Sequence, residues 1–172
     1  MKYILAFMVI VALGVGGYVY FTQPDEIPNI MLKSSDGRQV DLAAMHAGKA
    51  ELLMIFLLPN CPISKFSLGL VNQYYPNYSA SIAFAGLFFG NQSTADRFKS
   101  DQQLPFPVYG IRDAVDPYAV NELIETVGTS HGTRAAVYGG TIVVVNEDRK
   151  VLFKLEKDDV KQLPEKLADL GY

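Results

Sequence analysis

The chain has 172 residues, a formal net charge of −3 and one cysteine. This weak acidity, without a stripe of clustered Lys and Arg, argues against nucleic-acid binding. A single cysteine cannot form an internal disulfide, so no disulfide framework stabilises the fold. With 49% hydrophobic and 19% charged residues, the composition is that of a globular domain that carries an apolar appendage.

The N-terminal segment, residues 1–21, is predicted to be a transmembrane anchor. Tyr3–Phe21 is a run of 19 residues without a charged side chain. As a helix it would be about 28 Å long, close to the thickness of a bilayer core. The alternative is a cleaved signal peptide. However, the run is longer than the usual apolar region of about 7–15 residues, and no small-residue cleavage site follows it. We therefore expect a single-pass membrane protein.

The charges on either side of this segment predict its orientation. Lys2 precedes the span, whereas Asp25 and Glu26 follow it. The positive-inside rule then places the N-terminus in the cytoplasm and the C-terminal domain in the periplasm or another extracytoplasmic space. Residues 22–29 are expected to form a short linker that keeps the domain, residues 30–172, near the membrane surface. At roughly 145 residues, this part is long enough for one domain with a buried core.

In the first half of the domain, strands and helices are predicted to alternate. Ser34–Arg38, with its Asp-Gly pair, is typical of a turn between two short strands. Leu52–Leu58 is a continuous apolar run of strand length, as in a central strand that is covered on both faces. Apolar residues on one helical face predict a helix over Pro62–Tyr75, with Pro76 ending it. Ile82–Phe89 is a second buried strand.

The second half continues this alternation. A capping box at Ser93–Asp96 predicts a helix that runs to about Gln103, and Asp116-Pro117 begins another. Thr141–Val145 is a third buried strand, which continues through a polar turn into Val151–Leu155. Smaller expected features are a short strand at Phe106–Tyr109 and a terminal helix over 160–170 that Pro164 breaks or restarts. The order of elements predicts an α/β fold whose sheet has a mainly parallel core and an antiparallel edge.

Cys61 stands between the central strand and the helix that follows it, in Asn60-Cys61-Pro62-Ile63-Ser64. The helix dipole favours a thiolate at this place, so Cys61 is a candidate nucleophile or metal ligand. Ser64 occupies the position at which a dithiol redox centre needs its second sulfur, and its hydroxyl could donate a hydrogen bond to a thiolate. If the protein is redox-active, Cys61 and Ser64 are therefore its candidate catalytic residues.

The element order and the Cys61 segment together resemble the thioredoxin fold, in particular its redoxin branch. That branch contains membrane-anchored thiol-disulfide oxidoreductases and the alkyl hydroperoxide reductase/thiol-specific antioxidant proteins. The resemblance covers about residues 30–170 and is carried by three segments. Ile27–Leu42 is similar to the family's opening hairpin, Ile55–Ser64 to the strand and helix of its CxxC motif, and Gly139–Asp148 to its cis-proline segment and closing hairpin. The resemblance implies a mixed central sheet flanked by helices.

Several positions depart from the pattern of that family. Ser64 replaces the resolving cysteine, Gly140 stands at the position of the cis-proline, and Ile55 replaces the acidic residue that many members bury beneath the active site. In the antioxidant branch a threonine stands at the position of Leu58, and Arg134 is the downstream candidate for its activating arginine. The resemblance therefore implies the scaffold but a degenerate CxxS active site.

Metal binding is a weaker hypothesis. Copper chaperones of the Sco type use this fold with two cysteines and a later histidine, and here His131 is the candidate for that histidine. One thiolate and one imidazole make a poor closed site for copper or zinc. His46 is expected at the surface. We therefore predict no metal site and no cofactor.

Two functions remain open on the sequence alone. The favoured one is a non-catalytic accessory or interaction subunit of a membrane protein complex, which contacts its partner subunits through the transmembrane helix and the membrane-proximal domain. The alternative is a single-thiol redox protein that uses Cys61 for thiol–disulfide exchange or peroxide reduction.

Overall fold

The structure, a computed structural model, describes residues 26–131 and 134–171. The predicted anchor at residues 1–21 and the first half of the predicted linker, residues 22–25, lie outside this part of the chain. Within these two ranges, no helix is both long enough and apolar enough to cross a bilayer.

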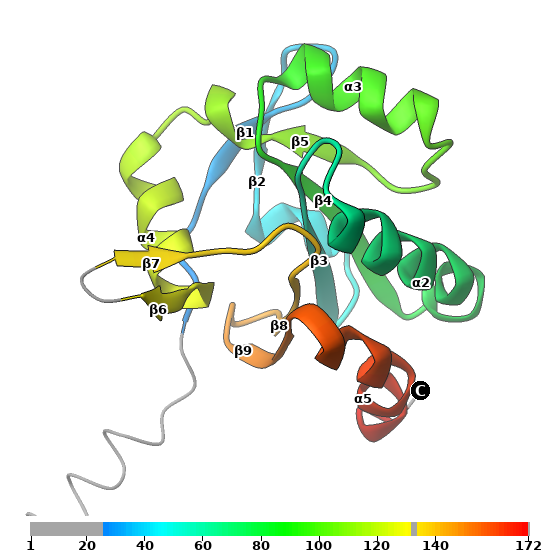
Figure 1. Ribbon diagram of the computed structural model, residues 1–172. Coiled ribbons are helices and arrows are strands. Elements are labelled where there is room, and N and C mark those ends of the chain that lie inside the picture. Colours follow the sequence, from blue (N-terminus) through cyan, green and yellow to red (C-terminus); the bar gives the residue numbers. More distant parts are fainter. Residues whose placement is uncertain (1–25, 132–133, 172) are drawn as a thin grey trace, which may run out of the picture.

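A five-stranded mixed sheet lies at the centre of the domain, with the strand order β5-β4-β3-β8-β9 (Figure 1). Its members are β3 (Glu51–Leu57), β4 (Ile82–Phe88), β5 (Val108–Gly110), β8 (Ile142–Asn146) and β9 (Val151–Leu155). The pairs β3–β4 and β4–β5 are parallel, whereas β8 pairs antiparallel with both β3 and β9. This arrangement confirms the predicted α/β fold, with its parallel core and antiparallel edge.

Helices cover both faces of this sheet. They are α2 (Pro62–Tyr78), α3 (Gln92–Asp101), α4 (Pro117–Val127) and α5 (Leu163–Asp169), with short 3-10 turns η1 (Ala43–His46), η2 (Ile111–Asp113) and η3 (Lys157–Gln162). The buried apolar residues of α2, α3 and α5 belong to one hydrophobic cluster, and those of α4 belong to a second one. The domain is therefore a three-layer structure, with the sheet in the middle.

The central strand β3 contributes to both clusters, because successive side chains of a strand point to opposite faces. Leu53, Ile55 and Leu57 pack on the face of α2, while Leu52, Met54 and Phe56 pack on the face of α4, and all six are fully buried. A strand covered on both faces needs an unbroken apolar run, which is why the sequence alone identified this strand.

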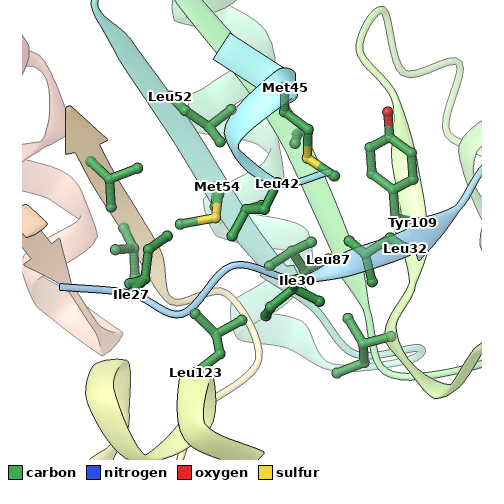
Figure 2. Packing of buried hydrophobic residues seen from close by; sticks show 14 of the residues in the cluster. Ile27, Ile30, Leu32, Leu42, Met45, Leu52, Met54, Leu87, Tyr109 and Leu123 are labelled. Carbon is green, nitrogen blue, oxygen red and sulfur yellow. The ribbon is translucent and has the colours of Figure 1, made fainter. Parts of the chain in front are cut away.

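The opening segment completes the α4 face of the core. Figure 2 shows Ile27, Ile30 and Leu32 of this segment in the same cluster as Met54 of β3 and Leu123 of α4. The segment then forms the predicted hairpin, in which β1 (Met31–Lys33) pairs antiparallel with β2 (Gln39–Asp41) around a turn.

Two predicted helix ends are wrong. Pro76 does not end α2, which continues to Tyr78. A proline in the last turn removes a single intrahelical hydrogen bond, and the Ser79 N–H still donates to the Tyr75 carbonyl at 2.8 Å. The N-cap of α3 is Asn91 rather than a residue of the predicted capping box: its Oδ1 accepts the Thr94 N–H at 2.9 Å.

One further hairpin is not predicted by the sequence pattern. Strand β6 (Thr129–His131) pairs antiparallel with β7 (Arg134–Ala136), directly after α4. Both strands have three residues and lack the alternating apolar pattern on which strand prediction depends. The hairpin leads through Val137 to the turn that lies beside Cys61.

Candidate functional site

Cys61 lies at the N-cap of α2, four residues after β3 ends. The chain turns sharply at Asn60, whose φ is 60°, and Cys61 itself has an extended backbone, with φ −83° and ψ 120°. Pro62 follows in the first turn of the helix, where its missing N–H costs no hydrogen bond. The partly exposed thiol therefore sits at the positive end of a helix of 17 residues.

The pKa of the Cys61 thiol is lower than its ordinary value. Burial raises this pKa, but hydrogen bonds from the Ser64 N–H, the Ser64 hydroxyl and the Ile63 N–H stabilise the thiolate and outweigh burial. Because the thiolate is the nucleophilic form of cysteine, this environment favours a reactive thiol.

Ser64 is positioned to donate a hydrogen bond from its hydroxyl to the thiolate of Cys61. The side chain is only 1% exposed, and its Oγ accepts the backbone N–H of Leu58 at 3.1 Å. A hydroxyl donates one hydrogen bond while it accepts others. The N–H of Leu58 therefore helps to orient the hydroxyl that donates to Cys61. The structure thus brings together both of the candidate catalytic residues that the sequence indicated.

The turn before β8 lies directly against the start of α2. Its Gly140 N–H donates to the Phe56 carbonyl at 2.6 Å, and the Gly139 carbonyl oxygen is 4.0 Å from the Sγ of Cys61. A Cβ on Gly139 would lie 2.7 Å from the Ser64 Oγ, and a Cβ on Gly140 would lie 2.7 Å from the Ser67 Oγ. Gly140 also has a φ of +90°, which disfavours side chains. The two glycines therefore allow the backbone of the turn to touch the helix beside the thiol.

Gly140, which the resemblance places at the position of the cis-proline, has a left-handed conformation in this turn. The peptide bonds of the described residues are all trans. Ile55 lies in β3 on the face of α2, is fully buried and packs within the apolar cluster. Ile55, which the resemblance places at the position of a buried acid, is therefore part of the hydrophobic core.

A groove of about 530 Å³ opens at the start of α2, beginning at Pro62, the residue after Cys61. Its lining consists of the apolar side chains of Pro62, Ile63 and Phe66 from α2 and the charged side chains of Lys157, Asp158 and Lys161 from η3. Ile63 and Phe66 belong to the apolar face on which the sequence predicted this helix, but they are 36% and 46% exposed. Helical periodicity could not reveal the groove, because it shows which face of α2 is apolar but not how far along that face other elements cover it.

The remaining candidates lie elsewhere. His131 and Arg134 are paired across the β6–β7 hairpin. The prediction that His46 lies at the surface is wrong. Its side chain is only 6% exposed, because η1 packs against β3 and β4. Burial lowers the pKa of His46, against the opposing effects of a hydrogen bond with the Lys49 backbone and of the charge of Glu147. Residues 26–131 and 134–171 hold no group of three or more His, Cys, Asp or Glu that could bind a metal ion.

Comparison with known proteins gives structural likenesses only. No family profile and no curated protein sequence matches the chain. The crystal structure of peroxidoxin BcpB from Mycobacterium tuberculosis is similar with a TM-score of 0.66 at 13% identity, over 86% of this chain and 95% of that one. The solution structure of a thiol:disulfide interchange protein from Bacteroides sp. is similar with a TM-score of 0.62 at 14% identity, over 86% of this chain and 91% of that one.

A thiol:disulfide interchange protein of the thioredoxin family from Chlorobium tepidum TLS gives a TM-score of 0.62 at 15% identity, over 86% of this chain and 97% of that one. The domain therefore has a thioredoxin-like fold, a mixed sheet flanked by helices, as the sequence resemblance implied. At such low identities the likeness establishes the fold, and the reaction has to be argued from the site.

Proposed function

We propose that this protein is a single-thiol redox protein, which forms a mixed disulfide with a partner through Cys61 and does not turn over a disulfide by itself. The observation that carries the proposal is the environment of Cys61. The thiol is partly exposed at a helix N-terminus, and three hydrogen-bond donors lower its pKa, one of them the hydroxyl of Ser64. A cysteine without a role needs none of these features.

The reaction is an exchange of one disulfide for another. The thiolate of Cys61 attacks one sulfur of a disulfide in the partner, so that a bond forms between the two proteins and the bond within the partner breaks. The second sulfur of the partner leaves as a thiolate and takes up a proton. Since Ser64 offers no sulfur, a thiol from outside the domain must attack the mixed disulfide and release Cys61.

Peroxide reduction by the same thiol is supported less well. In that reaction the thiolate attacks one oxygen of the peroxide, giving a sulfenic acid and an alcohol or water. Leu58, which stands where the antioxidant branch carries threonine, offers its backbone N–H to Ser64 but has no hydroxyl for the peroxide. We therefore place thiol–disulfide exchange first.

The place of this chemistry is also part of the proposal. Residues 1–21 would anchor the protein in a membrane, and the domain would face the periplasm or another extracytoplasmic space, where disulfide-bearing partners persist. Resistance to extraction at alkaline pH, lost in a variant without residues 1–25, would support the anchor. Release of the full chain by the same treatment would refute it.

A second candidate is a non-catalytic subunit of a membrane protein complex, with partner subunits bound by the anchor and the domain. It is favoured by the residues that replace the redox machinery, Ser64, Ile55 and Gly140, and by the exposed apolar side chains of Ile63 and Phe66. In this case the fold would be retained as a binding scaffold, and the thiol of Cys61 would have no reaction to perform.

One experiment separates the two candidates. Free thiols in cells that express the full chain are blocked with N-ethylmaleimide, and the membranes are then analysed on non-reducing and native gels. The single-thiol function predicts adducts that disappear with reductant and in Cys61→Ser. Ser64→Cys should also lose them, because the introduced thiol can attack the mixed disulfide. Migration in a large complex with no adduct, unchanged in Cys61→Ser, would support the subunit instead. A free monomer without adducts would contradict both.

A further inference from the structure

The groove beside Cys61 has the composition of a small protein-binding site. Among the described residues only five large hydrophobic side chains are markedly exposed, and two of them, Ile63 and Phe66, lie side by side in this groove. Exposed apolar side chains rimmed by charged ones mark surfaces that bind another protein. The groove begins at Pro62, the residue after Cys61, so a polypeptide joined to the thiol starts within one residue of the groove.

The charged wall of the groove is positive, although the chain as a whole carries a net charge of −3. Two lysines, Lys157 and Lys161, face one carboxylate, Asp158. The ion pair between Lys161 and Asp158 spans 3.2 Å with side chains 64% and 95% exposed, so solvent screens it and another anion can replace it.

Lys157 is held in place by the turn that carries the two glycines. Its Nζ lies 4.2 Å from the centre of the Tyr138 ring, a cation–π contact that keeps the charge at the edge of the groove. A partner that places a carboxylate here gains attraction from a lysine whose position is already restricted, and therefore loses less side-chain entropy on binding.

We propose that this groove selects the partner: it binds an extended polypeptide segment in which an apolar side chain and an acidic side chain stand next to the cysteine that Cys61 engages. The apolar side chain would pack on Ile63 and Phe66, and the carboxylate would pair with Lys157 or Lys161. This inference rests on the proposed single-thiol function and names the class of its substrate, a protein disulfide flanked by acidic and apolar residues.

The test measures disulfide exchange of the full chain, purified in mild detergent, with two peptide disulfides of equal length. Both carry Phe beside the cysteine, followed by two Asp in one peptide and two Lys in the other. The uncharged reagent 2-hydroxyethyl disulfide reports the reactivity of the thiol itself. We expect the acidic peptide to react at least about tenfold faster than the basic one at low salt, a preference that falls as salt screens the charges.

Substitutions in the groove should change this preference. The double variant Lys157→Glu/Lys161→Glu is expected to reverse it, and Phe66→Ser to slow both peptides relative to the small reagent. Lys99→Glu, on α3 and outside the groove, makes the same change of charge as either of these two lysine substitutions alone and should leave the ratio as it is.

The possible failures are distinguishable. If 2-hydroxyethyl disulfide reacts with Cys61 but both peptides react equally fast, the inference about the groove is overturned and the proposed function stands. If none of the three probes reacts, the proposed function itself fails. If the full chain dimerises and Phe66→Ser dissociates the dimer, a second copy of the chain occupies the groove and the inference is wrong.

Discussion

Replacement of Gly140 by alanine should destabilise the domain through the contact between the turn and α2. The residue has a φ of +90°, and an added Cβ would lie 2.7 Å from the Ser67 Oγ and 2.8 Å from the Ile63 carbonyl oxygen. Real Cβ atoms do not approach other atoms so closely, so either the turn or the first turns of the helix must move. Because Cys61 begins that helix, the environment of the thiol moves with it.

Gly48 provides the matched control. It has a similar φ of +78°, but an added Cβ would meet no atom within 4 Å. Gly48→Ala should therefore cost only the left-handed backbone conformation, about 1 kcal/mol. Gly140→Ala carries this cost together with that of an overpacked contact, about 1–3 kcal/mol more. The difference between the two variants isolates the contact between the turn and the helix.

Urea unfolding of the two variants and the wild type, followed by circular dichroism, measures both free energies of unfolding. We expect a lower midpoint for Gly140→Ala than for Gly48→Ala, and a changed alkylation rate of Cys61 in the former alone. Equal losses of stability, within about 0.5 kcal/mol, would refute the reasoning that the turn is packed against α2.

The remaining predictions concern single side chains. Ser64→Ala removes a donor to the thiolate, so the pKa of Cys61 should rise, seen as a shift of its alkylation profile to higher pH; an unchanged profile would exclude this role of the hydroxyl. His46→Leu should reduce the loss of stability on acidification below about pH 6.5. Burial lowers the pKa of His46 in the folded state, so below about pH 6.5 the unfolded chain binds more protons than the folded one and the folded state loses stability. Urea midpoints at several pH values measure this effect. Asn91→Ala removes the cap of α3 and should cost about 1 kcal/mol in urea unfolding, whereas Ser93→Ala should cost less.

The sequence predicted the core of this fold because burial on both faces leaves a clear pattern. The apolar runs that became β3, β4 and β8 are continuous, and their boundaries in the structure lie within a residue or two of the predicted ones. The β6–β7 hairpin was missed because three-residue strands carry no such pattern. Pro76 misled the prediction because the cost of a proline depends on its position within the helix.

The candidate site was predicted in its residues but not in its shape. The sequence identified Cys61 and Ser64, since helix N-termini and the spacing of a CxxC motif are visible in a chain. It could not show that Leu58 orients the Ser64 hydroxyl, a contact that depends on how β3 meets α2. Nor could it bring Lys157 to the groove, because this residue lies 96 positions after Cys61 in the chain.

The most direct test of the central claim is the reaction of the folded full chain with 2-hydroxyethyl disulfide, followed by intact mass measurement. The proposal predicts one adduct on Cys61 that persists until an external thiol is added, that is absent in Cys61→Ser, and that forms faster in the wild type than in Ser64→Ala. If the folded protein gains no adduct, and Cys61 reacts only after denaturation, the claim that this site holds a reactive thiol is wrong.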